Sequence, residues 1–164
     1  MALTVLPLDL DRWDEAARDC LVLPVFKDDR PLRGAAGLAD WRMCGRLSRL
    51  LKANRASAEQ GETMLLPPGR RLRFKKVLWF GLGDAKGYSD ERFRKDIAWI
   101  LGVVSKVGVA DWTLQAPGRA SGLIGARRAI EIILEDRLIV DQPVTLIEDP
   151  AGQKDIAELL RQAR

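Results

Sequence analysis

The chain has 164 residues, of which 47% are hydrophobic and 30% are charged, and its formal net charge is +4. This length and composition are typical of a globular domain and exclude a wholly disordered chain. The sequence contains no histidine, which excludes the most frequent general base and the most frequent neutral metal ligand of proteins. The positive charge permits weak attraction to nucleic acid or other anions without predicting either.

The sequence predicts a cytoplasmic protein. No run of about 18 apolar residues occurs, so we expect no membrane span. The opening segment has no basic region and is interrupted by Asp9, Asp11 and Asp14, unlike a signal peptide. The only two cysteines, Cys20 and Cys44, lie among apolar residues, and we expect both to be buried and reduced.

Strand-like and helix-like segments alternate along the chain. Residues 3–10 and 20–26 are rich in Val and Leu, and the second run is apolar on both faces, as in a central strand covered by helices. Residues 38–54 predict one helix, because apolar residues line one face and arginines line the other. The other expected elements are, in chain order, strands over 62–66 and 76–82, a helix over 89–107 with Ser89 as its N-cap, a strand over 112–116, a helix over 122–137, a strand over 144–147 and a helix capped by Asp149.

This alternation predicts the fold class. Strands separated by helices indicate a three-layer α/β/α domain around a mixed, mostly parallel sheet. No internal repeat, low-complexity tract or long linker divides the chain. We therefore expect a single domain over residues 1–164.

Glycine-bearing loops follow three of the expected strands. In each loop, backbone N–H groups and a helix start could hold a phosphate, or small residues could simply permit a tight turn. Gly34 and Gly37 match neither the P-loop nor the dinucleotide spacing, so a tight turn is favoured there, as it is at Gly81 and Gly83. In the third loop the two interpretations are evenly balanced, and its candidate residues are Ser121, Gly122, Gly125, Arg127 and Arg128.

Basic residues form a cluster that could contact nucleic acid. A second basic stripe on the expected helix over 38–54 would extend such a surface. Solvated turns and helix faces produce the same pattern more often, and no aromatic residue is obviously placed to stack on bases. The candidate nucleic-acid residues are Arg70, Arg71, Arg73, Lys75 and Lys76, with Arg42, Arg46 and Arg49 in the second stripe.

Arrangements of catalytic side chains are largely missing from the sequence. Without histidine, neither a Ser–His nor a Cys–His pair can form. Glu131 and Glu135 are one helical turn apart, but Arg127 and Arg128 precede them, so we expect surface ion pairs. No group of carboxylates is typical of a divalent-cation site. The sequence thus predicts no metal and no cofactor.

Four segments resemble the N-terminal domain of the leucyl (cytosol) aminopeptidase family. They are the Asp-apolar strand at 19–26, the linker with an acidic turn and the helix after it at 27–51, the segment GETMLLP at 61–67, which resembles G-E-x-x-x-L-P, and KVLWFGLG at 76–83, which resembles the K-x-V-L-x-x-G-L-G strand. They occur in the family's order. The similarity covers residues 15–110 well and becomes approximate from Trp112 onward.

The resemblance also implies a fold and a ligand. The N-terminal domain of this family resembles a macro domain, the α/β module that binds ADP-ribose. By this resemblance Asp19 matches the residue that holds the adenine. Gly34 to Gly37 match the first glycine-rich loop, and a later loop is matched by Ser121, Gly122 and Gly125.

The resemblance implies a function without catalysis. Peptidase chemistry in this family resides in a separate C-terminal domain with a two-metal site, and no segment here matches its N-T-D-A-E-G-R signature. We therefore expect a stand-alone, non-catalytic interaction, regulatory or assembly module with a protein partner or self-association. Two alternatives stay open: a small-molecule binder of nucleotide or ADP-ribose type, and the non-catalytic subunit of a split metalloaminopeptidase.

Overall fold

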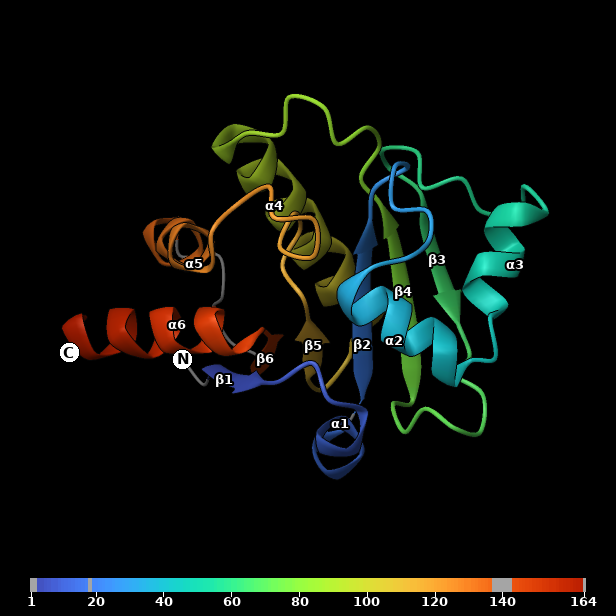
Figure 1. The fold of residues 1–164 in the computed structure, drawn as a ribbon, viewed down its shortest axis with the longest axis horizontal. Helices are drawn as coiled ribbons and strands as arrows, with labels where there is room; N and C mark the ends of the chain where they lie inside the picture. Colours follow the sequence, from blue (N-terminus) through green and yellow to red (C-terminus); the bar gives the residue numbers. More distant parts are fainter. Residues whose placement is uncertain (1–2, 18, 137–142, 164) are drawn as a thin grey trace.

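The computed structural model describes residues 3–17, 19–136 and 143–163, which form six strands and six helices (Figure 1). The strands are β1 (Leu3–Leu6), β2 (Cys20–Val25), β3 (Thr63–Leu66), β4 (Lys76–Gly81), β5 (Trp112–Leu114) and β6 (Val144–Ile147). The helices are α1 (Leu10–Ala16), α2 (Gly34–Arg42), α3 (Arg46–Lys52), α4 (Asp90–Val107), α5 (Ala126–Glu135) and α6 (Pro150–Gln162).

All six strands belong to one sheet, in the order β1-β6-β5-β2-β4-β3. Every neighbouring pair is parallel except β3 with β4, which is antiparallel. Strand β2 lies between β4 and β5 and is buried on both faces, as expected of a strand covered by helices. The predictions of a mixed, mostly parallel sheet and of a central strand at 20–26 are confirmed.

Helices cover both faces of the sheet and create two hydrophobic cores (Figure 1). On one face, Leu21 and Leu23 of β2 pack with α1, α2 and α3 around the fully buried Trp13. On the other face, Cys20 and Val22 pack with α4, α5 and α6. Because side chains alternate along a strand, β2 supplies both cores. The molecule is a three-layer α/β/α domain, as predicted.

The helix expected over 38–54 is two helices, and this prediction was wrong. Cys44 and Gly45 have φ angles of 56° and 79°, a left-handed conformation that a continuous helix excludes. The carboxylate of Asp40 then accepts a hydrogen bond from the N–H of Leu47 at 2.8 Å. It therefore caps the first turn of α3, which stabilises the break.

This break also overturns the expectation that both cysteines are buried. Cys20 is buried in β2 and Cys44 is exposed in the turn between α2 and α3, and both thiols are free. Burial raises the pKa of Cys20 to about 12, because a low-dielectric environment disfavours the thiolate. Met43, the neighbour of Cys44 in the sequence, enters the core, whereas the turn directs Cys44 itself to the surface.

Other element boundaries also differ from the sequence prediction. The strand expected over 3–10 ends at Leu6, and Asp9 caps α1 by accepting a hydrogen bond from the N–H of Asp11 at 2.9 Å. The helix expected over 122–137 begins only at Ala126, because the preceding residues form turns, and residue 137 lies outside the described residues. The predicted caps Ser89 and Asp149 are confirmed. Among the described residues, no helix is long and apolar enough to cross a membrane.

Candidate functional site

The carboxyl ends of β2 and β5 are the place where an α/β domain of this kind would bind a ligand. The two strands are parallel neighbours, so the loops that follow them, 26–33 and 115–125, meet at one edge of the sheet. Gly34 at the start of α2 and Ser121 in the second loop lie there. The contacts between these loops determine whether a cleft is open.

A side chain of the second loop reaches the N-terminus of α2. The Oε1 of Gln115 accepts a hydrogen bond from the N–H of Ala35 at 2.8 Å, the kind of donor that would otherwise bind an anion. Gly34 has a φ of 55°, and a Cβ atom there would lie 2.8 Å from the Cβ of Ala120 and closer still to Gln115. Gly34 thus permits close packing of the two loops. Gly37 packs in the same way, against the backbone carbonyl of Leu32.

A second hydrogen bond closes the same edge. The hydroxyl of Ser121 donates to Oδ1 of Asp29 at 2.9 Å, and Oδ2 of Asp29 accepts from the N–H of Phe26 at 3.1 Å. Asp29 is buried. The cavity left between the loops, which Arg33 and Gly118 also line, has a volume of about 10 Å³. This volume admits at most about one water molecule.

The second loop is also anchored to β6 and α6. The guanidinium of Arg119 donates from Nε and Nη2 to the two oxygens of Glu148 at 2.8 and 2.7 Å, and from Nη1 to the carbonyl of Ile124 at 2.8 Å. Glu148 is buried. A two-pronged, charge-assisted contact of this kind holds both partners in one geometry. The loop that carries Ser121 is therefore clamped from both sides.

The other two candidates of this loop face outward. Gly122 and Gly125 are exposed, and a Cβ atom at either position would meet nothing within 4 Å. Gly125 precedes α5 as its N-cap residue. The structure therefore brings Gly34 and Ser121 to one edge, with Gly122 and Gly125 outside the contact.

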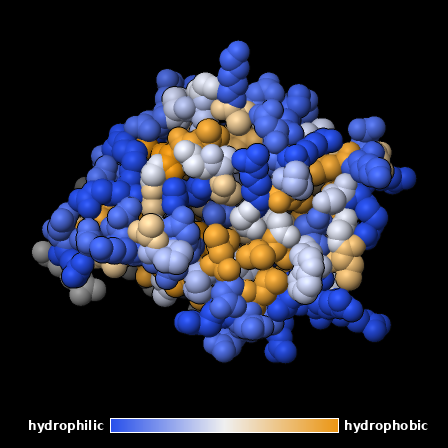
Figure 2. Space-filling model, viewed as in Figure 1, coloured by the Kyte–Doolittle hydropathy of each residue, from blue (hydrophilic) through white to orange (hydrophobic). Residues whose placement is uncertain are grey.

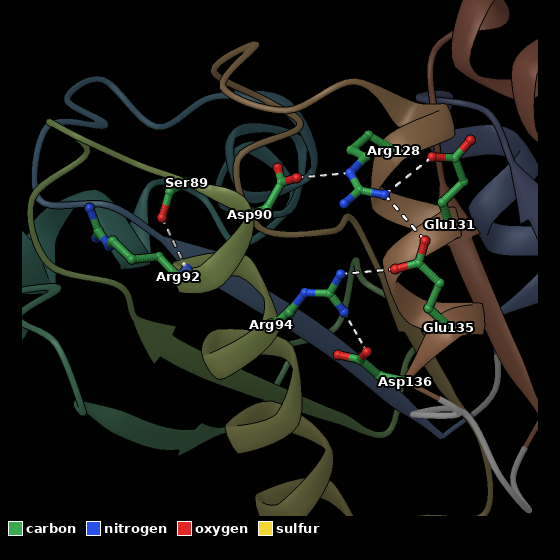
Figure 3. Close-up of polar contacts among 8 residues, drawn as sticks. All are labelled: Ser89, Asp90, Arg92, Arg94, Arg128, Glu131, Glu135 and Asp136. Atoms are coloured by element: carbon green, nitrogen blue, oxygen red, sulfur yellow. Dashed lines mark hydrogen bonds and ion pairs between the residues drawn. The ribbon is translucent and has the colours of Figure 1, made fainter.

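Arg128, which follows this loop, and Arg94 of α4 form ion pairs that join α4 to α5 (Figure 3). Nε of Arg128 lies 2.8 Å from Asp90, and its Nη1 lies 3.4 Å from Glu131 and 3.3 Å from Glu135. Arg94 of α4 also contacts Glu135, at 2.9 Å. The remaining pairs are Arg127 with Glu131 and Arg94 with Asp136. The predicted surface ion pairing is confirmed.

Asp19 lies at the opposite end of β2 from Gly34 and Ser121. Its Oδ1 accepts from Nζ of Lys76 and its Oδ2 from the N–H of Ala110, both at 2.8 Å. Both hydrogen bonds lower the pKa of Asp19, and the one from Lys76 has the larger effect. The grouping of Asp19 with the two loops, implied by the resemblance, does not form, because Asp19 precedes β2 whereas both loops follow parallel strands.

The basic cluster divides into exposed and paired residues. Arg70, Arg71, Arg73 and Lys75 are exposed, whereas Lys76 is half-buried against Asp19. The second stripe is largely consumed by internal contacts: Arg42 with Asp14, Arg46 with the Pro67 carbonyl and Arg49 with the Cys44 carbonyl.

Trp41 was missed by sequence reasoning. Its side chain is 71% exposed and lines a surface hollow of about 400 Å³ together with Arg70, Arg71 and Arg73. The available signal was its position next to Arg42, on the face of α2 opposite the buried alanines. The cluster therefore has an aromatic neighbour that the sequence did not reveal.

A buried carboxylate was also missed. Asp96 of α4 is buried and accepts hydrogen bonds from the hydroxyl of Tyr88 at 3.1 Å and from Nε2 of Gln60 at 3.3 Å. Burial raises the pKa of Asp96. Among the described residues, no group of three or more His, Cys, Asp or Glu side chains is arranged to hold a metal ion.

Comparison with known proteins defines the family. A family model described as "Cytosol aminopeptidase family, N-terminal domain" matches residues 22–137. A probable cytosol aminopeptidase of Burkholderia multivorans is 31% identical over 98 residues, which are 58% of this chain and 19% of that protein. The chain spans about a fifth of the length of the curated relatives it matches.

Two solved structures share the fold. A mutant of tomato leucine aminopeptidase superposes with a TM-score of 0.60 at 12% identity, over 98% of this chain and 35% of that one. A Trypanosoma brucei macrodomain in complex with ADP gives a TM-score of 0.67 at 14% identity, over 97% of this chain and 69% of that one. At these identities the likeness establishes the macrodomain-like fold alone. Through the match over residues 22–137, the chain belongs to the cytosol aminopeptidase family, in the N-terminal domain of that family.

Proposed function

We propose that this domain is a non-catalytic interaction module, which acts in assembly or regulation and binds no nucleotide at the carboxyl ends of its strands. The closed edge between loops 26–33 and 115–125 is the observation that carries this proposal. Pockets for small ligands usually have volumes of about 300–1,000 Å³, whereas the cavity here has about 10 Å³.

A nucleotide could enter only if the closing contacts were broken. It would have to displace Gln115 from the N–H of Ala35 and separate Ser121 from Asp29. Asp29 is buried, and a buried polar group that loses its partner costs about 1–3 kcal/mol. The ADP in the Trypanosoma brucei macrodomain shows that the fold can hold a nucleotide. In this chain the edge between loops 26–33 and 115–125 is filled by the protein's own side chains.

The proposal also assigns peptide-bond chemistry to another domain. The chain has no histidine, and the described residues bring no three metal-ligating side chains together. The matched relatives are about five times longer than the aligned segment, so a catalytic domain would lie elsewhere, in the same polypeptide or in a separate subunit. Co-purification of the domain with a separate catalytic chain would favour the second arrangement.

A thermal-shift titration tests the closed cleft. We expect the melting temperature to stay constant in the presence of ADP or ADP-ribose, while the Trypanosoma brucei macrodomain serves as the positive control for ADP. A ligand present at a hundred times its Kd would add about 2.7 kcal/mol to the stability. A reproducible rise in melting temperature with either ligand would contradict the proposal.

A peptidase assay tests the absence of catalysis. The purified domain, supplied with Mn²⁺ or Zn²⁺ and a chromogenic leucyl substrate, should give no turnover above buffer. The control is the same preparation after heat denaturation. Turnover that persists at constant specific activity through a second purification would overturn the non-catalytic assignment.

A further inference from the structure

Trp41 is the one tryptophan of five that the fold leaves largely in solvent. Trp13, Trp79 and Trp112 are fully buried, and the ring of Trp99 packs edge-to-face on Phe80 with centroids 5.1 Å apart. The side chain of Trp41 is 71% exposed at the end of α2. Burial of a ring of this size against a partner would remove a large apolar area from water and so stabilise the complex.

This ring lines a charged hollow, here named the Trp41 groove, of about 400 Å³. Its lining residues are Asp14, Trp41, Arg42, Arg70, Arg71 and Arg73. Figure 2 shows that hydrophilic residues cover most of the visible surface, with hydrophobic atoms gathered in the lower middle of the view. Apart from Trp41, the lining residues of the groove are all charged, so a partner that binds there meets mostly charge and one apolar ring.

The arginines of the groove differ in their contacts. Nη1 of Arg42 donates to Asp14 at 2.9 Å and to the carbonyl of Arg71 at 2.8 Å, which ties the 70–73 segment to α1 and α2. Within the part of the chain that the structure describes, Arg70, Arg71 and Arg73 have no ion-pair partner. Guanidinium groups bind carboxylates through two parallel hydrogen bonds, so this cluster is suited to an acidic ligand.

The surroundings favour a protein over a nucleic acid. Asp11, whose side chain is 94% exposed, lies 4.0 Å from Arg42, and Asp14 also lines the groove. These carboxylates interrupt the continuous basic track that a phosphate backbone follows, whereas a short acidic segment needs only the few guanidinium groups of Arg70, Arg71 and Arg73. Among the described residues Trp41 is also the only strongly exposed aromatic side chain, so stacking of successive bases has no second ring. Trp and Arg are the residues most enriched where proteins bind each other tightly.

We propose that the Trp41 groove docks an acidic protein segment that carries one large apolar side chain. The apolar side chain packs on the ring of Trp41, and the flanking carboxylates pair with Arg70, Arg71 and Arg73. Helix α6 packs on the opposite face of the sheet from α1 and α2, which carry Asp14, Trp41 and Arg42 of the groove (Figure 1). This inference rests on the proposed interaction role and names the surface and the chemistry of the partner.

Fluorescence anisotropy with designed probes tests the docking. The probes are a fluorescein-labelled peptide of alternating Asp and Glu with one central Leu, the same peptide with Ser in place of Leu, and labelled oligothymidylate. We expect the Leu peptide to bind the wild type, and Trp41→Ala and Arg71→Glu to weaken that binding by about tenfold or more. Arg161→Glu, an identical charge change on α6, should leave the affinity within about twofold.

The Leu-to-Ser exchange in the peptide tests the apolar contact with Trp41 separately from the charge contacts. It should weaken binding to the wild type but have no effect on Trp41→Ala, because the two side chains interact only with each other. The melting temperature of each variant establishes that it is folded, and the substituted side chains are exposed, so we expect little change.

Three results would overturn the inference. They are equal binding of the peptides by wild type and Trp41→Ala, equal weakening by Arg161→Glu and Arg71→Glu, and tighter binding of oligothymidylate with the same dependence on Trp41. The last result would assign the groove to single-stranded nucleic acid. None of them changes the ADP and ADP-ribose titrations, so failure of the docking and failure of the closed cleft are distinguishable.

Discussion

Replacement of Arg119 by Met should cause the largest loss of stability among single substitutions at the strand-end loops. The guanidinium makes three hydrogen bonds of 2.7 to 2.8 Å, two to Glu148 and one to the carbonyl of Ile124. Methionine fills much of the same space but replaces none of these bonds. The carboxylate of Glu148, which is buried, then has no cation beside it.

The expected loss follows from that buried charge. Removal of one partner from a buried ion pair costs about 3–5 kcal/mol, more than the pair itself contributes. For a domain of this size, that loss lowers the melting temperature by about 6–20 °C. A second substitution, Glu148→Gln, removes the uncompensated charge, so the double variant should regain part of the lost stability.

Urea unfolding followed by tryptophan fluorescence measures these differences, provided that the transition is two-state. The matched control is Arg94→Met, which breaks exposed ion pairs with Glu135 and Asp136 and should have a small effect, because water screens such pairs. A loss of stability for Arg119→Met that is no larger than that for Arg94→Met would show that the unpaired Glu148 carboxylate costs little.

Three further outcomes follow from the structure. Gly34→Ala should destabilise the domain by about 1–3 kcal/mol more than Gly122→Ala, because both have a positive φ but only Gly34 is packed against another loop; equal losses in urea unfolding would mean that the cleft is open. Cys44 should react with a thiol reagent in the native state while Cys20, whose pKa is raised to about 12, reacts only on unfolding; two fast thiols would contradict the burial of β2. The pKa of Asp96 is raised in the fold, so this carboxyl contributes stability below its unfolded pKa that is lost as pH rises through the folded pKa. Between about pH 4 and pH 7, the free energy of unfolding of Asp96→Asn relative to that of the wild type should therefore increase as pH rises. A decrease would show that the fold stabilises the ionised carboxylate.

Local sequence signals were sufficient for most elements. The apolar spacing of α4 and the caps Ser89 and Asp149 act over a few residues, so the sequence alone locates these helices. The two-sided apolar run of β2 likewise predicts a central strand, and the segments at 61–67 and 76–83 predict the family. Such features depend on neighbours in the chain, which a sequence displays directly.

The candidate site was decided by contacts between distant residues. Gln115 meets Ala35 and Ser121 meets Asp29 across 80 and 92 positions of the chain, and no local pattern predicts that these loops close the cleft. The parallel order of the strands, in turn, puts Asp19 at the opposite end of the sheet from those loops.

The exposure of single side chains was likewise outside the reach of the sequence. Whether Trp41 or Cys44 is buried depends on where α2 ends, and the left-handed turn there is stabilised by the capping of α3 by Asp40. Hydrophobic spacing predicts which face of a helix enters the core, but not which apolar residue the end of that helix leaves in water. The sequence thus determined most of the elements and the family, and the tertiary structure decided which loops close on each other and which side chains are exposed, because both depend on long-range packing.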